Sequence, residues 1–192
     1  QYTAPRLSLG VNLYYMKYKD QLVPMGRIND GYDALNDNVD DSYRRGVELS
    51  ASWKVTGWFT ASANATFSQN RIENYVDALK DSPTYGKELG DMTIAYSPDV
   101  IANAFLNFHH RGFEAVFHTQ HVGKQYFTNN ENDALSLDAY CVTNLNLAYT
   151  FRTRSARSVR MGLLINNLFN AEYESNGYGY SYMDTWSGPA PV

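Results

Sequence analysis

Histidine, carboxylate and thiol side chains are the groups in this sequence that could bind a metal or serve as nucleophiles and bases. His118 and His121 form an HxxH pair, and His109 and His110 are adjacent. Both pairs lie in stretches that alternate like β-strands, where positions i and i+3 point to opposite faces of a sheet. The four histidines therefore do not converge on a metal site, and we interpret them as side chains of a polar sheet face or of turns.

Carboxylates gather in one polar stretch, which carries six aspartates: Asp20, Asp30, Asp33, Asp37, Asp40 and Asp41. Their spacing lacks the EF-hand pattern that a calcium loop requires. A solvated loop is our first interpretation, and a loop-bound calcium ion is the alternative. The sequence also lacks the P-loop, dinucleotide, nucleophile-elbow and zinc-protease motifs, and Cys141 is the single cysteine. We predict no catalytic residue, no metal site and no cofactor.

Aromatic side chains in polar stretches are the best binding candidates, because rings with polar tips bind sugars, flat chelates and peptides well. The alternative is that these rings pack the loops against each other or form an aromatic girdle, and both interpretations stay open. The candidates are Tyr75, Tyr85, Tyr126, Phe127, Tyr178, Tyr180, Tyr182 and Trp186.

Seven segments that alternate apolar and polar residues must position these side chains. In the last of them Val159, Met161, Leu163 and Ile165 fall on one face. The segments run for about ten to fourteen residues, longer than the five or six of a usual strand and long enough for a tilted strand to cross a bilayer. The predicted strands span about 7–18, 43–55, 58–70, 100–110, 113–124, 137–151 and 159–166.

The connections between these segments alternate in length. Short ones are expected at 56–57, 111–112 and 152–158, and long polar ones at 19–42, 71–99, 125–136 and from 170 onward. Outer-membrane barrels have short turns on one side and long loops on the other. We therefore predict an all-β, antiparallel up-and-down meander of about seven long strands that forms part of a transmembrane β-barrel, with a soluble β-sandwich as the alternative.

Composition excludes several other classes. The 192 residues carry a net charge of −4, which gives nucleic-acid binding no electrostatic support. No run approaches the roughly 20 apolar residues that a membrane-spanning helix needs, whereas a β-barrel tolerates the mean hydropathy of −0.46 because only alternate residues face lipid. Trp53, Trp58, Phe59, Tyr149 and Phe151 lie near the short connections, where an interfacial girdle belongs.

Two longer motifs resemble a known family, the TonB-dependent outer-membrane receptors. NNLFNAEYESNGYGYSY (166–182) resembles their penultimate strand end and last outside loop, and SYRRGVELSASWKVTGWFTASANATFSQNRI (42–72) resembles a hairpin of their barrels. Ser97-Pro98 and VNLYYMKYKDQLV (11–23) are also similar to that family. The wealth of Tyr and Asn resembles receptors of the Bacteroidetes type.

This resemblance implies a barrel of about 22 strands closed by an N-terminal plug, located in the bacterial outer membrane. It implies uptake of a scarce nutrient (an iron chelate, cobalamin or a glycan) with energy passed from TonB through the plug, and no enzymatic activity. Residues 1–192 would then be a single barrel segment, about strands fifteen to twenty-one, without the plug and the last strand. A passive porin-like or adhesive barrel is the alternative function. Outer-membrane lipid is an expected partner, and the isolated segment would self-associate through its open strand edges.

Overall fold

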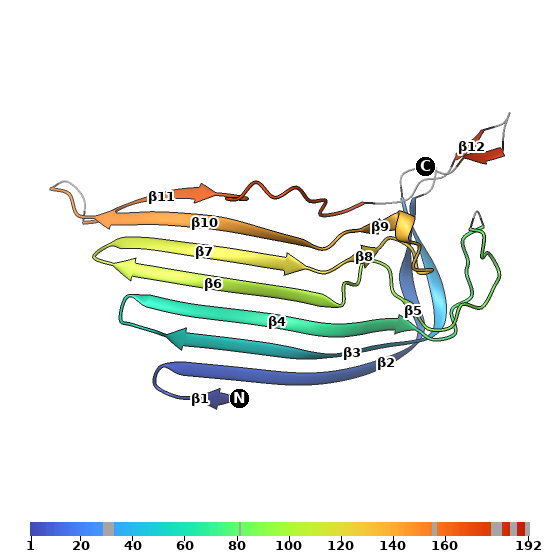
Figure 1. Cartoon of the computed structure of the whole chain (residues 1–192), viewed down its shortest axis with the longest axis horizontal. Helices are drawn as coiled ribbons and strands as arrows, with labels where there is room; N and C mark the ends of the chain where they lie inside the picture. The colour runs from blue at the N-terminus through green and yellow to red at the C-terminus, as the bar shows by residue number, and fades with distance from the viewer. Residues whose placement is uncertain (29–32, 81, 155–156, 178–181, 185–187, 191–192) are drawn as a thin grey trace.

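A single large antiparallel sheet dominates the computed structural model of the chain (Figure 1). The structure describes residues 1–192 except 29–32, 81, 155–156, 178–181, 185–187 and 191–192, and it describes only the backbone of 182–184 and 188–190. The nine-stranded sheet has the order β1-β2-β3-β4-β6-β7-β10-β11, and β5 also pairs with β4. Neighbours in the sheet are neighbours along the chain, so this is the predicted meander. None of the described helices is long and apolar enough to cross a membrane.

The seven predicted strands correspond to β2, β3, β4, β6, β7, β10 and β11 of the described chain, which confirms the predicted number; β11 has seven residues and the other six have ten or more. β6 spans Val100–His110 as predicted. The other bounds are β1 (Tyr2–Thr3), β2 (Leu7–Ile28), β3 (Ala34–Lys54), β4 (Phe59–Ile72), β5 (Met92–Thr93), β7 (Phe113–Val122), β8 (Gln125–Tyr126), the 3₁₀ turn η1 (Asp133–Leu135), β9 (Ser136–Leu137), β10 (Tyr140–Phe151), β11 (Val159–Ile165), β12 (Tyr182–Asp184) and β13 (Gly188–Ala190).

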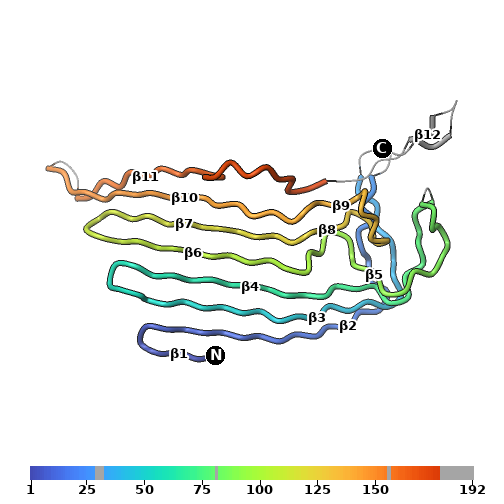
Figure 2. Tube along the Cα trace, in the orientation of Figure 1, coloured from blue at the N-terminus to red at the C-terminus, as the bar shows by residue number. Residues whose placement is uncertain are grey.

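Short turns occupy one end of the sheet and long connections the other (Figure 2). At the β6–β7 turn, Arg111 and Gly112 have φ of 48° and 84°. Two successive residues with positive φ are the signature of a type I′ turn, whose twist matches that of the strands it joins. Gly112 is required here because a Cβ would lie 2.4 Å from the backbone oxygen of Thr150 on β10.

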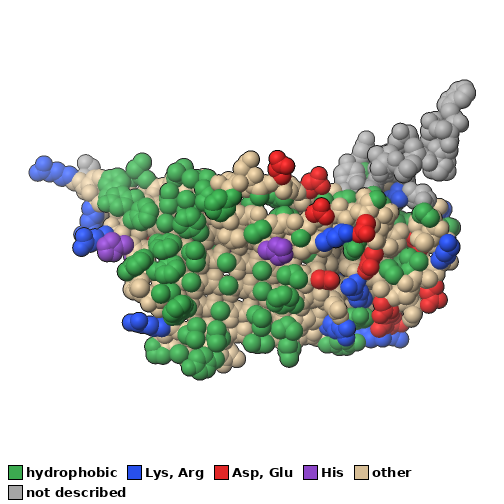
Figure 3. Space-filling view, viewed as in Figure 1, with side chains coloured by type: hydrophobic (Ala, Val, Ile, Leu, Met, Phe, Trp, Pro, Cys, Tyr) green, Lys and Arg blue, Asp and Glu red, His purple; other side chains and the backbone are tan. Residues whose placement is uncertain are grey.

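The two faces of the sheet differ in character. Cross-strand register places apolar residues together on one face, here called the apolar face, as in the row Leu7, Trp53, Ala61, Leu106, Phe117 and Leu145. In the view of Figure 3 hydrophobic side chains cover the body of the sheet and charged ones gather toward its ends. No second layer covers this face among the described residues, so the two-layer core of a β-sandwich is not formed.

The stretch 19–42 was predicted as a loop, and this prediction is wrong for most of it. β2 and β3 continue to pair far beyond the rest of the sheet, from Gln21 with Val39 to Pro24 with Asn36. The extension is stabilised because Val23 and Val39 are buried in one apolar cluster with Ile72, Tyr75 and Ile94. The register shifts between Pro24 and Ile28, around Gly26 with its φ of 71°.

The long connections pack into one body at this end of the sheet. We call it the loop assembly: the outer parts of β2 and β3 (19–28 and 34–42), residues 73–99 and residues 123–139. Its buried apolar cluster consists of Val23, Val39, Tyr75 and Ile94 together with Ile72 at the end of β4, and Leu89 and Met92 pack against it. The loops therefore have a hydrophobic core of their own, which holds their outer surface in a defined shape.

Candidate ligand-binding surface

Asn129 ties three segments of the loop assembly together. Its side chain is buried, its Oδ1 accepts a hydrogen bond from the Ala95 amide at 2.7 Å, and its Nδ2 donates to the Pro24 carbonyl at 2.9 Å. One amide side chain thus satisfies backbone groups of the β2–β3 extension and of the 73–99 connection. An apolar residue there would leave buried backbone groups without partners.

Asp77 organises a second polar cluster. Its carboxylate accepts hydrogen bonds from the Leu79 amide (3.0 Å), the Thr84 hydroxyl (2.6 Å) and Asn130 Nδ2 (3.1 Å). Burial alone would raise the pKa of Asp77, but the hydrogen bonds from Ser82 and these three groups outweigh burial and hold the pKa below its usual value of 3.8. The ionised carboxylate therefore joins the 73–99 and 123–139 connections at neutral pH.

Glu131 anchors the 123–139 connection to strand β4. Its Oε1 accepts hydrogen bonds from Arg71 Nη1 at 2.6 Å and from the Thr93 amide at 2.9 Å, and also from the Thr93 hydroxyl. Arg71 lies in β4 and Thr93 in β5. This contact fixes how the loop assembly sits on the sheet.

The predicted binding residues Tyr75 and Tyr85 lie in very different places. Tyr75 is 3% exposed and belongs to the core of the loop assembly, whereas Tyr85 is 52% exposed. The Tyr85 backbone closes a turn by donating to the Ser82 carbonyl at 3.1 Å, which presents its ring to the surroundings. Contact with a ligand stays a prediction for both, and only Tyr85 offers its ring in this arrangement.

Tyr126 and Phe127 lie next to each other in the 123–139 connection and are half-buried. Lys124 Nζ lies 4.9 Å from the centroid of the Tyr126 ring, and the Tyr126 hydroxyl donates to Asp133 Oδ1 at 3.4 Å. Phe127 packs against Tyr96, with ring centroids 6.1 Å apart. Both rings are therefore held by neighbours while part of each stays accessible, and ligand contact stays a prediction for them.

Other aromatic residues of this surface were not singled out from the sequence. The Tyr96 hydroxyl donates to the Gly177 carbonyl at 3.0 Å, and the rings of Tyr140 and Tyr173 stack at 4.6 Å. Gly177 also touches Phe127, since a Cβ there would lie 2.5 Å from that ring. These contacts join the segment after β11 to the loop assembly. The sequence gives little indication of the role of Tyr96, because only the adjacent Ser97-Pro98 distinguishes its position.

Three further predicted residues, Tyr178, Tyr180 and Trp186, lie outside the described residues. Tyr182 begins β12, for which only the backbone is described. Their role in ligand binding stays a prediction.

The polar face of the sheet continues from the loop assembly toward the short turns. Asn103 Nδ2 donates to Asn64 Oδ1 at 3.1 Å, and His118 Nε2 lies 2.9 Å from Asn103 Oδ1. The His118 ring stacks on Phe105 with centroids 4.4 Å apart. Hydrogen-bonded polar side chains on three neighbouring strands therefore make the polar face of the sheet a hydrophilic surface, here called the polar wall.

The structure places His118 and His121 on opposite faces of β7, as the strand geometry requires. His118 Nε2 lies within hydrogen-bond distance of Asn103 Oδ1 on the polar face, as interpreted from the sequence. That interpretation is wrong for His121, which pairs in register with Ala102 and Cys141 on the apolar face. Among the described residues, no group of three or more His, Cys, Asp or Glu side chains is arranged to hold a metal ion.

These features define the chemical capacity of the site. A pre-packed loop surface with accessible aromatic rings lies at the end of a polar wall, and the opposite face of that wall is apolar. Such an arrangement is chemically suited to contact small polar or aromatic molecules on one side and lipid on the other.

Comparison with protein families agrees with this geometry. Residues 1–168 match the model described as "TonB dependent receptor-like, beta-barrel". The chain therefore belongs to the TonB-dependent receptor β-barrel family. The family's barrels lie in the outer membrane of bacteria, so the apolar face is the surface that meets lipid.

Solved structures show the same fold. The ferric yersiniabactin uptake receptor FyuA from Yersinia pestis superimposes with a TM-score of 0.63 at 18% identity, covering 98% of this chain and 26% of that one. The copper transporter OprC gives 0.62 at 22% identity, covering 90% and 25%. The siderophore receptor PiuA from Acinetobacter baumannii gives 0.62 at 16% identity, covering 88% and 22%. The chain thus spans about a quarter of the length of these proteins.

Proposed function

We propose that this chain is the ligand-capturing barrel segment of a receptor that imports a scarce nutrient across the outer membrane with energy from TonB, and that it is not an enzyme. The observation that carries the proposal is the loop assembly. Its buried apolar cluster and its side-chain hydrogen bonds hold aromatic rings at the end of the polar face of the sheet. A pre-organised surface loses little conformational entropy when it binds a ligand.

Among the nutrients considered, we propose an iron chelate ahead of cobalamin or a glycan. Two of the structural relatives named above are described as receptors for siderophores or their ferric complexes. Flat aromatic chelates also suit the half-exposed rings of Tyr126 and Phe127 and the exposed ring of Tyr85. Contact of the ligand with Tyr178, Tyr180 and Trp186 is part of the same proposal.

The test is uptake by cells that make the full-length receptor and lack their other iron receptors. Labelled ferric catecholate, cobalamin and a starch oligosaccharide are offered in turn, with and without functional TonB. We expect accumulation of the ferric complex only when TonB is present. Equal uptake without TonB would instead support a passive porin-like barrel, and cell adhesion without uptake would support an adhesive one.

Binding by the full-length receptor tests the named rings. Replacing Tyr85 or Phe127 by Ala should weaken binding of the ferric catecholate about tenfold, the scale of an aromatic hot spot. Tyr85→Phe keeps the ring and should bind as the parent does. Tyr75→Phe is the matched control within the loop core, and a larger loss there than in Tyr85→Ala would move the site away from the exposed rings.

We also propose that residues 1–192 supply about strands fifteen to twenty-one of a barrel of about 22 strands. β1 and β11 form the two ends of the described sheet path, and open edges pair readily with other strands. The isolated segment should therefore form oligomers or aggregates when measured by light scattering. A monodisperse monomer would contradict this proposal.

A further inference from the structure

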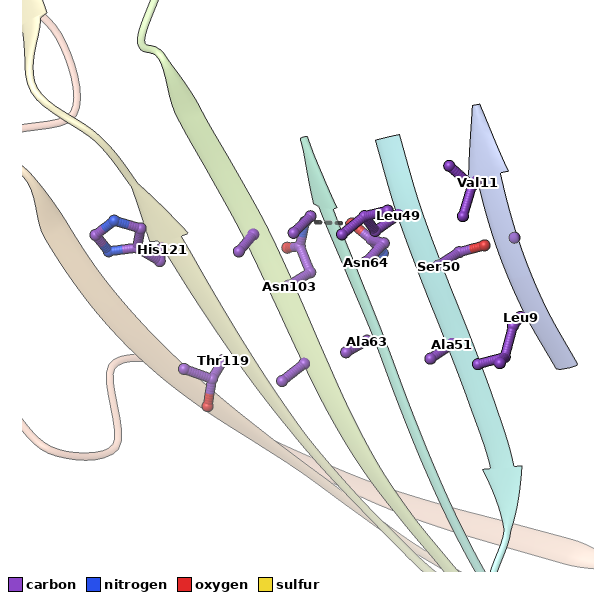
Figure 4. Close-up of a pocket in the computed structure, with 14 residues that line it drawn as sticks. Leu9, Val11, Leu49, Ser50, Ala51, Ala63, Asn64, Asn103, Thr119 and His121 are labelled. Atoms are coloured by element: carbon purple, nitrogen blue, oxygen red, sulfur yellow. Dashed lines mark hydrogen bonds between the residues drawn. The ribbon is translucent and has the colours of Figure 1, made fainter. Parts of the chain in front are cut away.

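The middle of the apolar face is hollowed rather than flat. Its floor is made of Ala51, Ala63, Ala65, Ala102 and Ala104, which are neighbours in the registers of β3, β4 and β6. We call this feature the alanine hollow. Its volume is about 530 Å³, and its lining residues belong to β2, β3, β4, β6 and β7; Figure 4 shows how these side chains lie.

Larger side chains border the alanine hollow. Leu9, Val11 and Leu49 line its β2–β3 side, and Thr119 and His121 of β7 line the other. The floor is flanked along the strands by Phe67 of β4 on its long-connection side and by Leu106 of β6 on its short-turn side. Both side chains are well exposed. The hollow is therefore a groove with raised apolar walls.

The groove crosses the membrane-facing band obliquely. On β2 it begins at Leu9, beside the short β1–β2 turn, and on β7 it ends at His121, next to the long-connection end of that strand. Because the short turns mark one side of the membrane and the long loops the other, the groove rises toward the outside as it passes from β2 to β7.

His121 gives the outer end of the groove a polar group. The neighbouring hydroxyls of Thr119 and Thr143 lie 2.9 Å apart and satisfy each other. The described residues provide the half-buried His121 ring with no hydrogen-bond partner. An ionisable side chain on a lipid-facing surface is costly unless it meets a polar group, and at this depth the polar groups are the esters and headgroups of lipids.

We propose that the alanine hollow is a binding groove for one ester-linked acyl chain of an outer-leaflet lipid, whose ester accepts a hydrogen bond from His121. The groove is continuous with the lipid-facing surface, and its floor and walls are apolar. Its one polar end lies at the depth where a lipid has its ester and headgroup. A chain in the groove contacts protein on three sides instead of one, so it exchanges more slowly than its neighbours. This inference rests on the membrane location and not on the imported nutrient.

Photochemical labelling of the full-length receptor tests the groove. The receptor is placed in vesicles of phosphatidylethanolamine and phosphatidylglycerol with a trace of phosphatidylethanolamine that carries a diazirine within one acyl chain. We expect lipid adducts to concentrate on peptides containing Ala63 and Ala104, relative to those containing Leu163 on the same face. Ala63→Leu should reduce adducts in the groove about fourfold, the effect of losing the burial of about one methylene.

The matched control is Ala61→Leu, which adds the same side chain to the same face of β4 outside the groove. Labelling spread evenly over the apolar face, or an equal reduction in Ala61→Leu, would overturn the proposal. Heat-dependent migration on gels verifies that each variant has inserted. Ala104→Val is the milder replacement if Ala63→Leu does not insert.

A second probe with its diazirine beside the ester tests His121. His121→Leu should lose the adducts on β7, and His121→Gln, which can still donate a hydrogen bond, should keep most of them. Equal labelling in the two variants would show that His121 does not hold the lipid.

Discussion

The sheet exposes large apolar side chains, whereas the loop assembly buries them. On the sheet, Leu13 and Leu163 are exposed and lie on a face that no described segment covers. In the loop assembly, Val23 and Ile94 are almost completely buried. The difference shows that the chain folds in two solvents, because lipid takes the place of a core for the sheet while the loops in water must build one.

One of the two largest expected effects separates the two faces of one strand. Ala63 and Asn64 are adjacent in β4, the first on the apolar face and the second on the polar face. Ala63→Arg should destabilise the inserted barrel by about 2–4 kcal/mol, whereas Asn64→Arg should change stability little. Urea titration of the full-length receptor in phospholipid vesicles measures both.

Equal losses in these two variants would mean that both faces meet the same surroundings. That outcome would contradict the assignment of the apolar face to lipid.

The next prediction addresses the core of the loop assembly. Ile94→Ala removes a side chain that is 1% exposed and should cost the loop assembly about 2–5 kcal/mol, while the barrel still inserts. Hydrogen exchange should rise across 73–99 and stay unchanged in β6. Val76→Ala, in the same connection but 51% exposed, is the control and should have little effect.

A simultaneous loss of insertion in Ile94→Ala would show that the two regions are not independent. That outcome would contradict the interpretation that the loop assembly has a core separate from the lipid-facing sheet.

A smaller, pH-dependent effect is expected at Asp77. Its folded-state pKa is lowered, so its contribution to stability is present above the unfolded value of 3.8 and is lost as the pH falls through the folded value. The protection of the 73–99 amides, which is their exchange relative to the intrinsic rate at each pH, should therefore be constant near neutral pH and fall in acid below the usual value of 3.8.

Asp77→Ala should loosen the same residues at neutral pH by about 1–3 kcal/mol and remove the acid-dependent step. An acid step of unchanged size in that variant would assign it to another group.

The sequence predicts the structure of the sheet much better than that of the loop assembly. The strands were predicted well because alternation is local, and the bounds of β6 agree at both ends. The β2–β3 extension was missed because Val23 and Val39 have their apolar neighbours in other loops. Contacts such as Asp77 with Asn130, 53 residues apart, leave no local pattern. The split between buried Tyr75 and exposed Tyr85 likewise depends on packing between distant segments.

The smallest expected effect compares two short turns of the sheet. Gly112 has a φ of 84° and faces the Thr150 backbone oxygen, whereas a Cβ at Gly57 would meet nothing within 4 Å. Gly112→Ala should cost about 1 kcal/mol or somewhat more, since both the strained backbone and the close oxygen oppose a side chain. Gly57→Ala should be neutral within about 0.5 kcal/mol. Urea titration in vesicles distinguishes them, and an equal effect would mean that the β6–β7 turn relaxes freely and that the register of β7 with β10 does not constrain it.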